Sequence, residues 1–195
     1  MTKRIILAGV LGAIAMFIWT AIAHMATPLG EAGIGEIPNE EAVLSAMTSG
    51  MGTKKGLYMY PGMGLGPDAT HAQQSEAMKD YEAKLAKNPS GLLMYHPAGS
   101  RSMNMAKNLT IEFITQLIEA LLVVALLAQT RIVTFGGRVG FVTVAGIFAA
   151  IATNVSYWNW WGFPATYTAP HMFIQIVGFF VLGLVAAFIF RKSEA

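Results

Sequence analysis

Four separated runs of about twenty apolar residues constrain this chain more than any other feature of its sequence. They cover residues 5–24, 109–128, 139–157 and 171–190. A bilayer core of roughly 30 Å needs about 20 apolar residues at a helical rise of 1.5 Å, so each run is long enough to cross it. Only 12% of all residues are charged, well below the roughly 25% that is usual in a soluble domain. The sequence therefore predicts a membrane protein built on a four-helix transmembrane bundle.

Small residues recur along the predicted spans at helical spacing. One stripe is Gly9, Ala13, Met16 and Thr20, and a second is Thr143, Gly146, Ala150 and Thr153. In lipid the hydrophobic effect does not drive helices together. Close packing through small side chains stabilises their association instead. We expect these stripes to form the seams of the bundle.

Basic residues in the short segments predict the orientation. They are Lys3, Arg4, Arg131, Arg138, Arg191 and Lys192. They precede the first run, separate the second from the third, and follow the fourth, and such positive segments stay in the cytoplasm. Both termini are then cytoplasmic, and residues 25–108 are extracytoplasmic. An alternative is that the first run is a secretory signal, because Ala21-Ile22-Ala23 fits a cleavage pattern, but its length favours a retained span.

The segment between the first two spans contains an internal repeat. Shifted by 35 residues, Gly56-Leu57 aligns with Gly91-Leu92, and Met59-Tyr60 aligns with Met94-Tyr95. Each copy has a helix-like stretch, starting near Asn39 or Thr70, followed by a short apolar strand. We therefore predict a small α/β insert of two helix-strand repeats. Two strands joined through a helix are expected to pair in parallel, with both helices on one face of the sheet.

Six methionines of this region allow two interpretations. They are Met51, Met59, Met63, Met94, Met103 and Met105. Thioether sulfur suits Cu(I), so a copper site is one reading. Methionine also fills apolar cores and interfaces, and this packing role is the preferred one.

An aromatic segment follows the third span. Trp158, Trp160 and Trp161 lie in it, and no charged residue occurs between residues 157 and 168. Indole rings favour the headgroup layer of a membrane. We expect an interfacial aromatic loop at the outer surface.

The second span contains a polar stripe. Polar side chains within an apolar span raise the free energy of membrane insertion. Glu112, Gln116 and Glu119 recur at i, i+4 and i+7, so they share one helix face. Glu119 lies about 18 Å from Arg131 along the helix, close to mid-bilayer. A carboxylate there costs about 2.5–3.5 kcal/mol on insertion scales. We predict that Glu119 faces the bundle and bonds to a polar group of another span.

Other polar residues fall at a similar depth. Asn154 and Gln175 lie within about a turn of Glu112, and with the stripe they form a predicted intramembrane polar cluster. His24 and His171 fall at the level of Glu112. Two imidazoles and a carboxylate can ligate a metal ion, and two imidazoles can ligate a haem. The alternative is that the histidines only mark the wet ends of their helices.

The sequence lacks the common signatures of catalysis and of nucleic-acid binding. There is no P-loop, no G-x-S-x-G and no H-E-x-x-H. With no cysteine, thiolate chemistry is excluded. A net charge of +2 is too small for a nucleic-acid surface. These absences favour a non-enzymatic protein.

Several local sequences resemble a group of uncharacterised small bacterial four-span membrane proteins. They are His24–Glu31, Pro38–Glu41, Gly56–Pro61 and Trp158–Pro164. The resemblance implies a bacterial cytoplasmic (inner) membrane and brings no function, cofactor or partner with it.

Residues 1–24 are thus predicted as span 1, residues 25–108 as the insert, and residues 109–195 as spans 2–4. Two functions remain open. The first is a non-catalytic binding, accessory or assembly subunit of a membrane complex, whose partners are lipid and other subunits or copies of itself. The second is a ligand-handling protein with a metal, haem, quinone or proton site between the outer ends of the spans.

Overall fold

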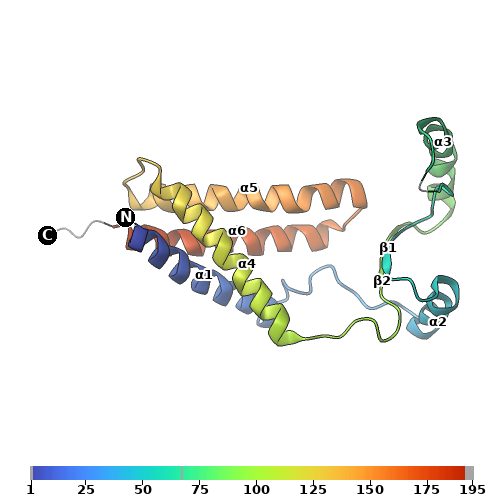
Figure 1. The fold of residues 1–195 in the computed structure, drawn as a ribbon, viewed down its shortest axis with the longest axis horizontal. Helices are drawn as coiled ribbons and strands as arrows, with labels where there is room; N and C mark the ends of the chain where they lie inside the picture. Colours follow the sequence, from blue (N-terminus) through green and yellow to red (C-terminus); the bar gives the residue numbers. More distant parts are fainter. Residues whose placement is uncertain (1, 67, 192–195) are drawn as a thin grey trace. The chain divides into compact units, whose positions relative to one another are not determined.

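The computed structural model describes residues 2–66 and 68–191 and divides into two compact units. The first unit is Met1–Gly35 with Asn104–Ala195. Its helices are α1 (Thr2–Met25), α4 (Met105–Ala128), α5 (Phe135–Trp161) and α6 (Ala165–Ile189) (Figure 1). Within the described residues, these four are long and apolar enough to cross a membrane. The prediction of four helices long and apolar enough to span a membrane is confirmed.

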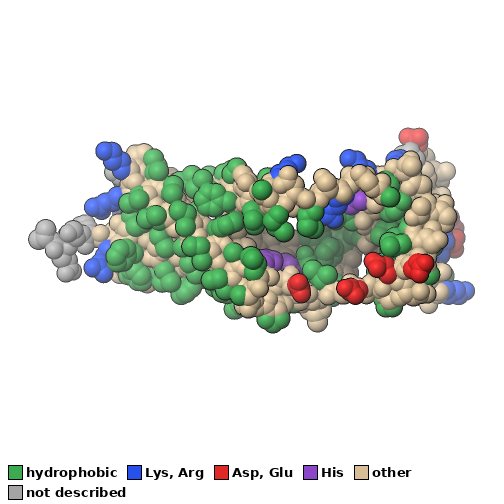
Figure 2. All heavy atoms as spheres, turned by 90° about the horizontal axis from the view of Figure 1, so that it is seen from below, with side chains coloured by type: hydrophobic (Ala, Val, Ile, Leu, Met, Phe, Trp, Pro, Cys, Tyr) green, Lys and Arg blue, Asp and Glu red, His purple; other side chains and the backbone are tan. Residues whose placement is uncertain are grey.

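The four helices pack around a narrow core. α1 lies against α4 and α6, α6 lies against α5, and α4 touches α5 only lightly because it crosses the other helices obliquely (Figure 1). Val124, Val142 and Leu182 are fully buried between them. Outward-facing apolar side chains stay exposed, such as Phe148 at 74%, and Figure 2 shows hydrophobic side chains over the bundle surface. Helices that face lipid are expected to be apolar both in the core and on the outer surface.

The bundle has two chemically different ends. The basic end comprises residues 2–4, 128–138 and 190–191, and Lys and Arg side chains gather there in Figure 2. The aromatic end comprises the C-terminal part of α1, the N-terminal part of α4 and the α5–α6 connection. Lys192, one of the residues used to predict orientation, lies outside the described residues.

Small residues form the helix seams as predicted. Ala13 and Ala150 are fully buried, and Gly9 and Gly146 are buried as well. A Cβ added at Gly9 would lie 2.5 Å from Leu121 Cδ2, and one added at Gly146 would overlap Phe179. The glycines therefore set how closely α1 approaches α4 and α5 approaches α6.

Replacing Gly146 with leucine should destabilise the bundle, because the new side chain must push α5 away from Phe179. Overpacking of this kind costs about 1–3 kcal/mol of unfolding free energy. Thermal unfolding in detergent, followed by circular dichroism, measures the loss. Gly140→Leu is the matched control, since a Cβ at Gly140 of the same helix meets nothing within 4 Å. Equal stability of the two variants would show that this seam is wrong.

The second unit, Glu36–Met103, contains the two predicted helix-strand repeats. In chain order its elements are α2 (Glu40–Met51), β1 (Gly56–Tyr60), α3 (His71–Lys87) and β2 (Gly91–Tyr95). Thr70 caps α3 with a capping box that includes Gln73, and this motif satisfies two N–H groups that the first helical turn leaves free. The order of the elements and the starts of both helices match the prediction.

The direction of strand pairing differs from the prediction, because β1 and β2 pair antiparallel and not in parallel. The register joins Gly56 to Tyr95 and Tyr60 to Gly91. Its central pair is Tyr58 with Leu93, which are equivalent residues of the two repeats, since 58 plus 35 is 93. The strands of the two repeats are thus related by a local two-fold axis. A parallel crossover needs a sheet that the connecting helix can cover, and neither α2 nor α3 packs extensively on this two-stranded ribbon.

The insert buries little of its apolar surface. Tyr95 is 8% exposed, and its hydroxyl donates to the Gly52 carbonyl at 2.9 Å. Neither α2 nor α3 has a buried residue. On one face of the ribbon, Leu57 is 63% exposed and its cross-strand partner Met94 is 69% exposed. The insert therefore presents an open apolar sheet face.

The three tryptophans do not lie in a loop. Trp158, Trp160 and Trp161 form the last turn of α5, which ends at Gly162 with a φ of 70°. Only residues 162–164 connect α5 to α6, because Pro164 already occupies the N-cap of the next helix. The aromatic and apolar residues after the predicted span continue the helix until glycine, which adopts left-handed φ without strain, ends it. All three indoles remain exposed.

Candidate functional site

A polar pocket of about 280 Å³ lies inside the bundle, toward its aromatic end. All four helices line it. Its lining residues are Met16, Thr20, His24, Glu112, Thr115, Gln116, Glu119, Thr153, Asn154, His171, Ile174 and Gln175. The structure therefore brings together every member of the predicted polar cluster, and both predicted histidines, around one cavity. α4 diverges from α5 in this half of the bundle, which leaves the space (Figure 1).

Gln116 is the most buried polar side chain of the pocket, with 3% of its surface exposed. Its Nε2 donates to Thr20 Oγ1 of α1 at 3.1 Å and to Glu112 Oε1 at 2.9 Å. Thr20 uses its own hydroxyl hydrogen on the Met16 carbonyl, so it can only accept from Gln116. This fixes the orientation of the amide. Gln116 joins α1 to α4 through its nitrogen.

The orientation leaves the amide oxygen of Gln116 without a partner. Oε1 is buried and has no hydrogen-bond donor among the described residues. A buried acceptor left unpaired costs about 1–3 kcal/mol, so such atoms are usually satisfied by water or a ligand. Gln116, which lines the pocket, thus holds a buried acceptor that no donor among the described residues satisfies.

Two carboxylates flank Gln116 on the same helix. Glu112 is exposed and accepts from Gln116, whereas Glu119 is half-buried. Both line the pocket, so the predicted inward direction of the stripe agrees with the structure. The predicted bond from Glu119 to another span is wrong: within the described residues its carboxylate has no hydrogen-bond or ion-pair partner. One helical turn earlier, Gln116 makes that contact instead, because it faces Thr20 directly.

The opposite wall of the pocket is a small amide network between α5 and α6. Gln175 Oε1 lies 3.2 Å from Thr153 Oγ1 and 3.3 Å from Asn154 Nδ2. Asn154 Nδ2 also donates to the Ala150 carbonyl at 2.9 Å. These donors are therefore largely used within the protein. The network ties the two helices together at the level of the cavity.

The two histidines meet at the aromatic end of the pocket. Their ring centroids are 6.1 Å apart, and the His171 ring stacks on Tyr167 at 4.0 Å. His171 Nδ1 lies 2.9 Å from the Tyr167 carbonyl, which can only accept, so Nδ1 carries a proton. Nε2 of a neutral His171 is then free to accept. Gly30 packs on His24, where an added Cβ would lie 2.6 Å from Nδ1.

The predicted metal site of His24, Glu112 and His171 is not assembled as a ligand set. In the part of the chain that the structure describes, no three His, Asp or Glu side chains are grouped closely enough to hold a metal ion. Glu112 is instead hydrogen-bonded to Gln116 of its own helix. The pocket volume of about 280 Å³ is close to the lower end of the roughly 300–1,000 Å³ of pockets for drug-sized ligands.

Several pocket residues were not identified as site residues from the sequence. Thr20 and Thr153 were assigned only to the helix seams, and Thr115 was not singled out. All three line the cavity. Hydroxyl groups at the level of a predicted polar stripe are the signal that identifies them, because seam residues and pocket residues lie on the same inward faces.

The electrostatic character of the pocket is acidic and rich in acceptors. Glu112 and Glu119 line it, and its described lining holds no lysine or arginine. Gln116 Oε1 adds a neutral acceptor. No protein-family model, curated protein or solved structure matches this chain. The residues of the pocket are therefore the evidence for what the protein binds.

Proposed function

We propose that this protein is a ligand-handling protein of the bacterial inner membrane, and that its bundle pocket binds a small cation that donates hydrogen bonds. The observation that carries the proposal is the unpaired, buried oxygen of Gln116 beside two carboxylates. We further propose that both termini are cytoplasmic and that residues 25–108 lie outside. The basic residues at one end of the bundle support this orientation.

The charge of the pocket favours a cation. Two glutamates in a membrane are costly unless protonated or paired, and the described lining contains no lysine or arginine to pair with them. A cation in the cavity would supply the missing partner. Glu119, which has no hydrogen-bond partner among the described residues, is the carboxylate that such a ligand would contact most directly.

The hydrogen-bonding pattern narrows the ligand further. Gln116 Oε1 can accept an N–H or O–H hydrogen bond, or it can ligate a hard metal ion such as Ca²⁺ directly. A quinone carbonyl needs hydrogen-bond donors from the protein. The side-chain amide N–H groups of Gln116 and Asn154 already donate to protein acceptors. A small primary ammonium satisfies both the charge and the acceptors. The cavity admits a ligand of a few heavy atoms.

Calorimetric titration of the purified protein in lipid nanodiscs tests this proposal. Methylammonium should bind saturably, whereas tetramethylammonium, with the same charge and no N–H, should bind at least about tenfold more weakly because it leaves Gln116 Oε1 unpaired. Equal binding of both cations would reject the role of Gln116. Saturable Zn²⁺ binding without methylammonium binding would support the metal alternative instead.

A second candidate function, a non-catalytic accessory or assembly subunit, is supported by the insert. The exposed sheet face of Leu57 and Met94, and a unit with few buried residues, are typical of a surface that a partner covers. A protein can combine both roles.

Native gel electrophoresis of a gentle detergent extract tests the subunit role. The wild-type chain should migrate as part of a larger particle, and Leu57→Lys with Met94→Lys should release it, because charges on the sheet face oppose an apolar contact. Lys54→Glu, an exposed change of charge that precedes β1, is the control. Migration of the wild type as a lone small particle would contradict this function.

A further inference from the structure

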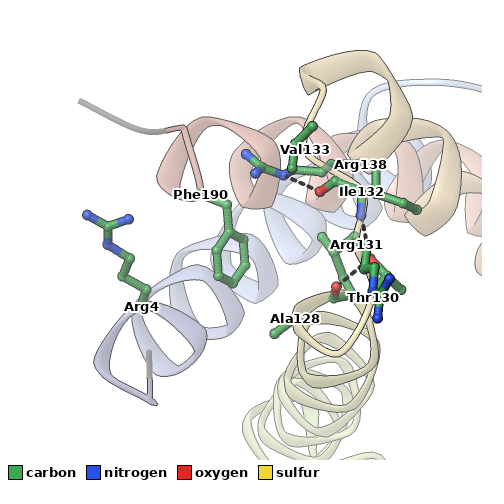
Figure 3. A pocket seen from close by; sticks show the side chains of 9 residues that line it. Arg4, Ala128, Thr130, Arg131, Ile132, Val133, Arg138 and Phe190 are labelled. Carbon is green, nitrogen blue, oxygen red and sulfur yellow. Dashed lines mark hydrogen bonds between the residues drawn. The ribbon is translucent and has the colours of Figure 1, made fainter. Parts of the chain in front are cut away.

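The basic end of the bundle contains a second pocket, which the proposed function does not use. Its volume is about 400 Å³. Figure 3 shows the side chains that line it: Arg4, Leu127, Ala128, Thr130, Arg131, Ile132, Val133, Arg138 and Phe190. They come from α1, the end of α4, the α4–α5 connection, the first turn of α5 and the C-cap of α6. Segments far apart in the sequence thus build one cavity.

Arg138 is held in place and is not a free surface side chain. Its Nε donates to the Ile132 carbonyl at 3.2 Å, and its guanidinium carbon lies 6.0 Å from the centre of the Phe190 ring (Figure 3). The residue is half-buried. One of the five guanidinium N–H groups is used in this way, so the others remain available to an acceptor. A fixed, planar donor group suits phosphate oxygens.

The pocket has an excess of positive charge. Three arginines line it, and its described lining contains no aspartate or glutamate. Arg4 and Arg131 are exposed and reach it from different segments. The charge of the lining therefore suits an anionic ligand.

The apolar part of the lining distinguishes a lipid from a free anion. Leu127 and Phe190 lie at the ends of membrane-length helices, and Val133 is 74% exposed. A free phosphate makes no favourable contact with these apolar side chains, whereas the glycerol and acyl region of a phospholipid packs on them. Basic pockets between spans on the cytoplasmic side are known to bind anionic headgroups.

We propose that this pocket, the arginine pocket, binds the phosphate headgroup of an anionic phospholipid, with Arg138 as its oriented ligand and Arg131 and Arg4 as further charge partners. The site is independent of the acidic pocket toward the other end of the bundle. It gives the protein a specific lipid partner at its basic end.

Native mass spectrometry of the full chain released from detergent tests this proposal. Dioleoyl-phosphatidylglycerol should remain bound to the wild type, whereas dioleoyl-phosphatidylcholine and inorganic phosphate should not. Arg138→Gln should weaken phosphatidylglycerol binding about tenfold, as expected for lost charge-assisted hydrogen bonds. Arg131→Gln, an exposed change that leaves the fold intact, should also weaken it.

Arg191→Gln is the matched control. Arg191 lies at the same end, 5.6 Å from the Phe188 ring, and does not line the pocket. Its loss should leave lipid binding unchanged. Equal loss in Arg191→Gln and Arg131→Gln would mean that interfacial charge alone attracts the lipid, and would overturn the site. Equal retention of inorganic phosphate would reject a lipid as the ligand.

Discussion

Methylammonium binding should be lost when Glu112 and Glu119 are both replaced by glutamine. The double variant keeps the size of both side chains but removes the negative charge of the pocket. Two charge contacts at about tenfold each predict an affinity at least about a hundredfold lower. Calorimetric titration in nanodiscs measures this loss.

The same double variant separates a binding role from a structural one. Removing two carboxylates from a membrane interior relieves part of their insertion cost, so thermal stability should stay the same or rise. Glu76→Gln, a charge removal on the exposed surface of α3, is the control and should not alter binding. Unchanged methylammonium affinity in the double variant would refute the acidic pocket as the binding site.

Gln116→Leu isolates the unpaired acceptor within that site. The variant removes Oε1 and also the contacts of Nε2 with Thr20 and Glu112. The hydroxyl of Thr20 still donates to Met16, so no new unpaired donor remains. We expect weaker methylammonium binding with little loss of stability, since one buried unsatisfied atom disappears. A large loss of stability with unchanged binding would instead identify Gln116 as a structural link between α1 and α4.

The second prediction with a large effect is the orientation of the chain in the membrane. Cysteine labelling measures this orientation as an all-or-none result. The chain has no cysteine, so a single introduced thiol is the only one present. Ser45→Cys, exposed on α2, should react with a membrane-impermeant maleimide in cells stripped of their outer membrane. Val133→Cys, 74% exposed at the basic end, should react only after the membrane is permeabilised.

The physical reason is the preference of arginine and lysine for the cytoplasmic side of short segments. A reversed pattern, with Val133→Cys labelled and Ser45→Cys protected, would overturn the orientation while leaving four spans in place. Labelling of both positions in intact membranes would contradict the four-span reading itself.

Part of the candidate site could be predicted because helical periodicity is a local property. The spacing of Glu112, Gln116 and Glu119 fixes them on one face of α4, and their polarity in an apolar run directs that face inward. The same depth count brought His24 and His171 together, and their rings lie 6.1 Å apart. The helix starts at Asn39 and Thr70 were also readable from local sequence, although only Thr70 makes a capping hydrogen bond.

The predictions that failed depended on contacts between distant segments or on where a helix ends. Strand direction in the insert depends on whether a helix can cover the sheet, and the repeat itself is compatible with either direction. The aromatic loop was wrong because no breaker occurs before Gly162, so α5 continues through the tryptophans. Gly162 and Pro164 were available as signals, and weighting them over hydropathy would have extended the helix.

The sequence alone thus determined the membrane-length helices, the inward polar face of α4 and the two repeats of the insert, since each follows from spacing along one segment. Tertiary structure decided which partner each polar atom finds. The unpaired oxygen of Gln116 exists only because Thr20 has already donated its hydrogen to Met16. The arginine pocket exists only because the ends of four helices and one connection meet there. Such sites depend on the positions of segments far apart in the chain, and local pattern does not encode those positions.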